Sequence, residues 1–178
     1  MIEDIIPPTD GDESDKMKKD KIIKLVLWCA VALWMALIFN FSAQTATESL
    51  ETSDSVLEVV LRFLDSSFEK LSEAEQAARC ERLSFYIRKA AHFSVFGVLG
   101  VLCAAAVSRY KVSVAVSGIT AAAISIAYAV SDEIHQHFVP GRACRIFDIC
   151  VDSAGSLVGI AVFMLILCYV RKRKSQTE

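Results

Sequence analysis

Acidic, basic and amide side chains gather between residues 131 and 159, in a pattern suited to binding or acid–base chemistry. Asp132 and Gln136 are four residues apart, with Glu133 one residue further round, so a helix places them on neighbouring faces. Arg142 follows a Pro-Gly pair, at which the chain can reverse direction. Carboxylates can transfer protons, and the arginine fork suits a phosphate group.

A second set of acids follows this turn on one helix face. Asp148, Asp152, Gly155 and Gly159 are separated by steps of four, three and four residues. In a membrane, glycines at this spacing let another helix approach closely. We therefore expect both aspartates to face protein. Carboxylates near the hydrocarbon are costly, which makes them candidates for a functional site.

Lys89 and His92 are further candidates, three residues apart at the start of another apolar run. Lys89 has an alternative explanation, because lysines at the end of a membrane helix often extend their amine to the interface. His92 lies about one turn deeper, where it needs a polar partner.

Long apolar segments must position these side chains. The chain has 178 residues, of which 54% are hydrophobic, and this composition is typical of a membrane protein with one domain. Its apolar runs are long enough to cross a bilayer as helices. We predict an all-α bundle of four transmembrane helices. The first three have apolar runs at residues 25–41, about 90–108 and 112–130, and the fourth runs from the helix face that carries Asp148 and Asp152 to residue 170.

Basic residues predict the orientation of this bundle. They precede the first run (Lys16 to Lys24), form a short connection (Arg109 and Lys111), and follow the last run (Arg171 to Lys174). By the positive-inside rule both termini are cytoplasmic, so the polar cluster faces outward. We divide the chain into a disordered acidic and basic tail (1–20), a membrane domain (21–170) and a basic tail (171–178).

The stretch between the first and second membrane helices, residues 45–88, has an amphipathic helical pattern. Its apolar residues recur at steps of three and four. We expect an extracytoplasmic segment that either lies on the membrane surface or caps the bundle. Ser72 and Glu75 form a capping box, so a helix is expected to begin there and to continue into the membrane. Asn40, Ser42 and Gln44 end the first helix either as solvated side chains or as one wall of the site.

The order of these residues resembles the VanZ-like family of small bacterial membrane proteins. The resemblance rests on Phe41-Ser42-Ala43-Gln44, Lys89 with His92, Asp132-Glu133 with Gln136, Pro140-Gly141-Arg142, and Asp148 with Gly155. It implies a bacterial cell-membrane location and, from the founding member, a link to teicoplanin resistance. One position departs from the family pattern, which usually has Asn where this chain has Asp152, and this makes the site more acidic.

Three kinds of function fit these residues. In a binding protein, Lys89, Asp132, Gln136 and Arg142 recognise an envelope lipid or a lipoglycopeptide. In an enzyme acting on a phosphate-bearing envelope lipid, the acid–base groups are His92, Glu133, Asp148 and Asp152. In a structural protein, the same charges only lock the bundle together.

Other classes are not supported by the sequence. It lacks a glycine-rich phosphate loop, a CxxC pair, a nucleophile elbow and an HExxH motif, and its short basic clusters do not predict nucleic-acid binding. We expect no cofactor. Suitable metal ligands occur at His92, Glu133, His135, His137, Asp148 and Asp152, but a metal site is not favoured, because His135 and His137 diverge on a helix and are explained by a solvated loop. Membrane lipids are the expected partners, and transport would require a homo-oligomer.

Overall fold

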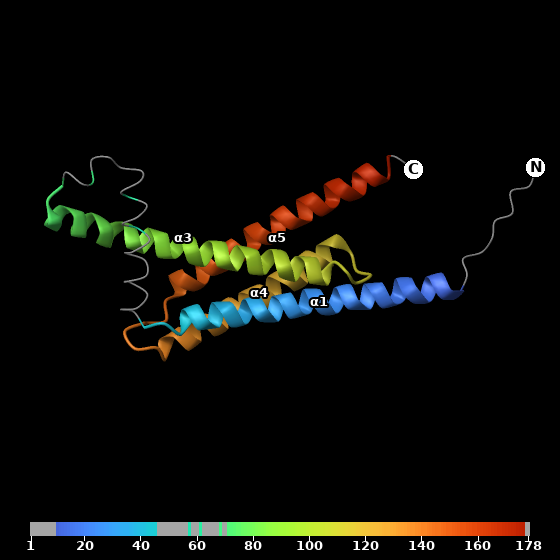
Figure 1. Ribbon diagram of the computed structural model, residues 1–178, viewed down its shortest axis with the longest axis horizontal. Helices are drawn as coiled ribbons and strands as arrows, with labels where there is room; N and C mark the ends of the chain where they lie inside the picture. The colour runs from blue at the N-terminus through green and yellow to red at the C-terminus, as the bar shows by residue number, and fades with distance from the viewer. Residues whose placement is uncertain (1–9, 46–56, 58–60, 62–67, 69–70, 177–178) are drawn as a thin grey trace, which may run out of the picture.

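The computed structural model describes residues 10–45, 57, 61, 68 and 71–176, and it is built from helices without any strand in these segments. The helices are α1 (Asp10–Ser42), α3 (Glu73–Val107), α4 (Val114–His137) and α5 (Ile146–Lys174). All four are long and apolar enough to cross a membrane, which confirms the predicted set of spans. They alternate in direction, so the start of α1 and the end of α5 lie at the same end of the bundle (Figure 1). We call this the terminal end, and the opposite end, which carries residues 138–145, the loop end.

Helix α1 begins earlier than the sequence pattern suggested. It starts at Asp10, so residues 10–20, predicted to be disordered, extend the first helix, whereas residues 1–9 lie outside the described part. Acidic side chains near a helix start interact favourably with the helix dipole. Asp20 also forms an ion pair with Lys24, one turn later, at 2.6 Å. Asp20 also accepts a hydrogen bond from Arg109 at 2.8 Å, which fixes α1 to the α3–α4 connection.

Helix α3 begins at the predicted capping box and continues without a break into the bundle. The Ser72 hydroxyl accepts a hydrogen bond from the Glu75 N–H, and the Glu75 carboxylate accepts one from the Ser72 N–H. At the loop end, α3 projects past α1 and α4 (Figure 1). The buried residues Leu57, Leu61 and Phe68 pack against this projecting part. The rest of the predicted amphipathic pattern at 56–65 lies outside the described residues.

The closest helix contact joins α3 to α5 through glycines. A Cβ added at Gly155 would lie 2.1 Å from the Phe93 carbonyl oxygen, and one at Gly159 would lie 2.0 Å from the Gly97 oxygen. From the other side, a Cβ at Gly100 would lie 2.2 Å from the Ser156 oxygen. The prediction that Gly155 and Gly159 allow a close helix approach is confirmed, and α3 supplies matching glycines.

Helix α4 packs through small side chains until its last turns. Its buried face consists of Ser117, Ala121, Ser125 and Ala129, followed by the polar Asp132, Glu133 and Gln136. The turn after α4 forms at Pro140-Gly141, as predicted, with Gly141 at a positive φ of 77° that glycine adopts without strain. Large apolar side chains such as Leu33, Ile119 and Leu165 remain at least 70% exposed, which fits a lipid-facing surface.

Candidate functional site

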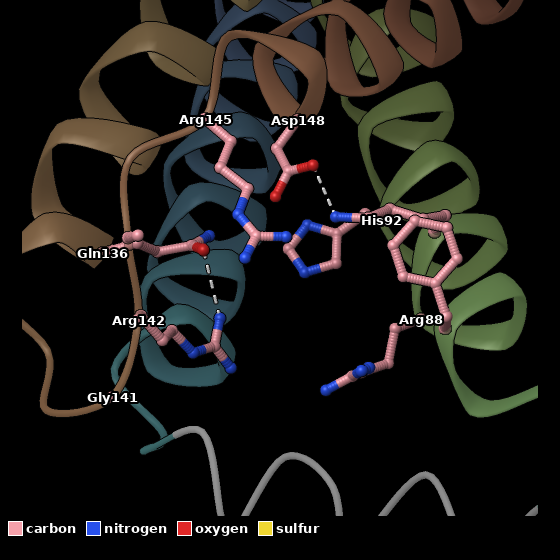
Figure 2. Close-up of a pocket in the computed structure, with 10 residues that line it drawn as sticks. Arg88, His92, Gln136, Gly141, Arg142, Arg145 and Asp148 are labelled. Atoms are coloured by element: carbon pink, nitrogen blue, oxygen red, sulfur yellow. Dashed lines mark hydrogen bonds and ion pairs between the residues drawn. The ribbon is translucent and has the colours of Figure 1, made fainter. Parts of the chain in front are cut away.

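A polar pocket of about 170 Å³ opens at the loop end, between the start of the membrane part of α3 and the α4–α5 connection (Figure 2). Helix α3 contributes one wall, and the reversal at Gly141 brings the basic connection against it. The pocket is lined by Phe85, Arg88, Lys89, His92, Gln136, Gly141, Arg142, Ala143, Arg145 and Asp148.

Positive charge dominates this pocket. Its only acid is Asp148, which accepts a hydrogen bond from the Lys89 amine at 2.5 Å. Arg88, Arg142 and Arg145 form no ion pair with any carboxylate among the described residues. Arg88 and Arg142 point toward the pocket from opposite sides (Figure 2). Three guanidinium groups are thus available to an anion, because the one acid is already paired.

Arg142 is held in place by an amide. Its guanidinium donates a hydrogen bond to Gln136 Oε1 at 3.1 Å. Burial lowers the pKa of Arg142, as does the neighbouring Arg88 charge, while the Asp132, Glu133 and Asp148 carboxylates raise it. The ordinary arginine pKa is so high that the group still carries its charge at neutral pH.

Behind Gln136, the same network reaches a buried aspartate. Asp132 Oδ2 accepts hydrogen bonds from the Ser42 hydroxyl at 2.7 Å and from Gln136 Nε2 at 2.9 Å. The side chain of Asp132 is buried, and its other oxygen, Oδ1, has no hydrogen-bond partner. This bond favours the wall interpretation for Ser42, whereas the Asn40 side chain is exposed.

His92 connects the pocket to two buried carboxylates. It lines the pocket, and its Nδ1 lies 3.5 Å from Asp152 Oδ1. Ligand-type atoms of His92, Asp132 and Asp152 lie within 4.8 Å of one another, one residue from each of α3, α4 and α5. Asp152 is 1% exposed, and neither of its oxygens has a hydrogen-bond partner.

Glu133 has a different environment. It is fully buried, and its Oε1 accepts a hydrogen bond from the Arg145 backbone N–H at 2.6 Å. Arg145 directly precedes the first residue of α5, so this bond fixes the end of the α4–α5 connection to α4. Glu133 does not line the pocket, and its contact with the backbone favours a role in positioning the basic connection.

The comparison with known families agrees with this architecture. The family model described as VanZ/LLP1 matches residues 27–167, which contain α3, α4, parts of α1 and α5, and every residue of the pocket. The chain belongs to the VanZ/LLP1 family. No curated protein and no solved structure shows a significant match. Together with its four candidate spans, the match makes this a multi-pass membrane protein.

In this VanZ/LLP1 chain, the eight predicted site residues lie at one end of the bundle but not in one cavity. Lys89, His92, Gln136, Arg142 and Asp148 line the pocket. Asp132 and Asp152 lie behind it against His92, and Glu133 holds the connection. The assignment of individual roles to these residues stays a prediction.

Two charged pocket residues of the VanZ/LLP1 chain, Arg88 and Arg145, were not among the predicted site residues. Arg88 lies four residues before His92, so the same spacing argument that paired Lys89 with His92 also placed Arg88 on that side of the helix. Arg145 lies three residues after Arg142 in the same connection. Of the two loop histidines, His135 stacks on Phe39, with 4.2 Å between ring centroids, and His137 is exposed beside Phe138.

Proposed function

We propose that this chain binds the anionic head group of a membrane amphiphile in the loop-end pocket, from the outer side of the cell membrane. The candidate ligands are a phosphate-bearing envelope lipid and a lipoglycopeptide antibiotic, and the resulting role is teicoplanin-type resistance or envelope homeostasis. The observation that carries the proposal is that Arg88, Arg142 and Arg145 line one pocket without a carboxylate partner among the described residues.

The chemistry of arginine supports an anionic ligand. A guanidinium donates two parallel hydrogen bonds to a phosphate or carboxylate, and a partly buried one gains more from such a bond than an exposed one. Arg142 is partly buried and already oriented by Gln136. The pocket also lies at the end of helices that are long and apolar enough to span a membrane, which is where we expect lipid head groups.

Binding can be measured with purified protein in nanodiscs. We expect saturable binding of short-chain phosphatidylglycerol or of teicoplanin, and much weaker binding of phosphatidylcholine. The separate titrations distinguish a lipid from the antibiotic as ligand. Arg142→Ala should weaken binding of the anionic ligand about 10- to 100-fold, because it removes a charge-assisted hydrogen-bond donor.

Two variants sharpen this test. Arg142→Lys keeps the charge but removes the fork, so it should also weaken binding, whereas Arg171→Ala, at the terminal end, should not. Equal affinities of native protein, Arg142→Ala and Arg142→Lys would contradict the proposal.

A cellular test addresses the physiological role. Cells that express the native chain or Arg142→Ala, at membrane levels matched by immunoblot, are compared for resistance to teicoplanin. Protection by the native chain alone would link the pocket to resistance. Equal protection by both would separate resistance from the pocket.

Hydrolysis of a bound phosphate-bearing lipid is the second candidate. It is favoured by the presence of His92, whose imidazole can act as a general acid or base, in the same pocket as the cations. No lining residue offers a hydroxyl or thiol nucleophile, so water would be the attacking group. Release of phosphate or head group from labelled envelope lipids by the native chain, and its loss in His92→Gln, would support turnover.

A further inference from the structure

We propose that His92, Asp132 and Asp152 form a binding site for a divalent transition-metal ion at the inner wall of the pocket. The site joins three helices, since each ligand comes from a different one of α3, α4 and α5. This inference does not require the proposed function to hold, because it concerns residues behind the cationic groups and has its own test.

The first step is the geometry. One ligand-type atom from each residue lies within 4.8 Å of the others. In a tetrahedral site with metal–ligand distances near 2 Å, ligand atoms are about 3.3 Å apart. The distance from His92 Nδ1 to Asp152 Oδ1 is already 3.5 Å. The separation of this pair is therefore close to that of two ligands of one ion, and all three pairs lie within 4.8 Å.

The second step is the state of the buried oxygens. Both oxygens of Asp152 and the Oδ1 oxygen of Asp132 are buried and have no hydrogen-bond partner. The two residues are 1% and 3% exposed. Buried carboxylates in proteins are almost always hydrogen-bonded, paired with a cation, or bound to a metal. A divalent ion placed among these oxygens would satisfy them and balance two negative charges.

The third step is the support behind one ligand. Ser42 and Gln136 both donate hydrogen bonds to Asp132 Oδ2, which leaves Oδ1 free and fixes the orientation of the carboxylate. Such outer hydrogen bonds are typical of carboxylates that bind metals. Gln136 also accepts a hydrogen bond from Arg142, so the same amide touches both the candidate metal ligand and the pocket.

The ligand set indicates the class of ion. One imidazole nitrogen and two carboxylate oxygens suit Zn²⁺, Mn²⁺ or Fe²⁺, whereas Mg²⁺ and Ca²⁺ prefer oxygen alone. Three protein ligands also leave a coordination position for water or for a group of a bound ligand. His92 lines the pocket, so that open position would be reached from it.

The test uses the full chain in nanodiscs, stripped with a chelator and then titrated with Co²⁺ and Zn²⁺, with Mg²⁺ as a comparison. We expect one equivalent of Co²⁺ to bind, with visible absorption bands, and Zn²⁺ to displace it. Asp152→Asn and His92→Gln should each weaken Co²⁺ binding at least tenfold, because each removes one ligand. His135→Gln should bind like the native chain, since His135 stacks on Phe39 and is not one of the three candidate ligands.

The outcomes separate this site from the alternatives. Absence of saturable Co²⁺ and Zn²⁺ binding by the native chain would overturn the proposal, and this measurement needs no variant to fold. Binding that is unchanged in both Asp152→Asn and His92→Gln would overturn it too, because the ion would then lie elsewhere. Loss of lipid binding in Arg142→Ala leaves this result untouched, so the two proposals can fail separately.

Discussion

Gly155 on α5 lies against the backbone of Phe93 on α3, so closely that a Cβ at Gly155 would be 2.1 Å from the Phe93 carbonyl oxygen. This contact lies between two groups of polar residues. Lys89 comes one turn before Phe93 and His92 directly precedes it, while Asp152 comes one turn before Gly155. The helix approach at the glycines therefore determines how close the ion pair and the histidine–aspartate contact can be.

Replacing this glycine should separate the two helices. Gly155→Ala is expected to lower the free energy of unfolding by about 2 kcal/mol or more, because a backbone oxygen cannot move aside as a side chain can. Gly118→Ala is the matched control, since a Cβ there meets nothing within 4 Å. It should leave stability within about 1 kcal/mol of the native value. Unfolding in mixed micelles followed by circular dichroism measures both, and equal stabilities of the two variants would contradict the packing argument.

Ser42 should matter for stability although it ends the first helix. Its hydroxyl donates to Asp132 Oδ2 and it is 1% exposed. Ser42→Ala removes a donor to a buried carboxylate, which should cost about 1–3 kcal/mol. Asn40→Ala should cost less, because the Asn40 side chain is exposed and bonds only to its own helix, at Ala36. Thermal unfolding in detergent compares the two, and a larger loss in Asn40→Ala would be inconsistent with the site wall described for α1.

Asp148→Asn tests the function of the ion pair with Lys89. Both side chains are partly exposed, at 22% for Lys89 and 18% for Asp148, so the loss in stability should be moderate, about 1–3 kcal/mol. The released amine adds a free cation to the pocket, and binding of an anionic lipid should be retained or tightened. Lipid titration and thermal unfolding of the same sample check both parts. Complete loss of folding would favour the view that these charges only lock the bundle.

The orientation of the bundle can be tested with a single cysteine. His137 is exposed at the loop end and Ser175 is exposed at the terminal end. In a background without native cysteines, His137→Cys should react with a membrane-impermeant thiol reagent added to intact cells. Ser175→Cys should react only after the cells are opened, as expected from the basic residues around it. The reverse pattern would place the pocket on the cytoplasmic side.

Much of the fold follows from the sequence, because its signals are local. The capping box at Ser72 defined a helix start, the Pro140-Gly141 pair defined a turn, and the spacing of Gly155 and Gly159 predicted a close helix contact. The start of α1 was placed too late, because its charged first turns carry no apolar periodicity. Ion pairs such as Asp20 with Lys24 stabilise a helix without such periodicity.

The site was predictable only in part, because its contacts are distant in the chain. Helical spacing related His92 to Lys89 and Asp152 to Asp148, but no spacing relates Ser42 to Asp132, which are 90 positions apart. For the same reason, the sequence offered His92 and Asp152 as possible metal ligands together with the loop histidines, but it gave no ground for grouping them with Asp132. The three residues that meet come from three helices, and only their packing brings them together.

The ion pair between Lys89 and Asp148 also bears on how the chain is made. Its partners are 59 positions apart, so α3 leaves the ribosome and enters the bilayer well before its counter-charge on α5 has been synthesised. The glycines of α3 likewise have no packing partner until α5 has been synthesised. The last helix therefore completes both the charge balance and the backbone packing of the second. A chain that ends before α5 would expose an unpaired lysine and a bare glycine face, which are features that membrane quality-control proteases can act on.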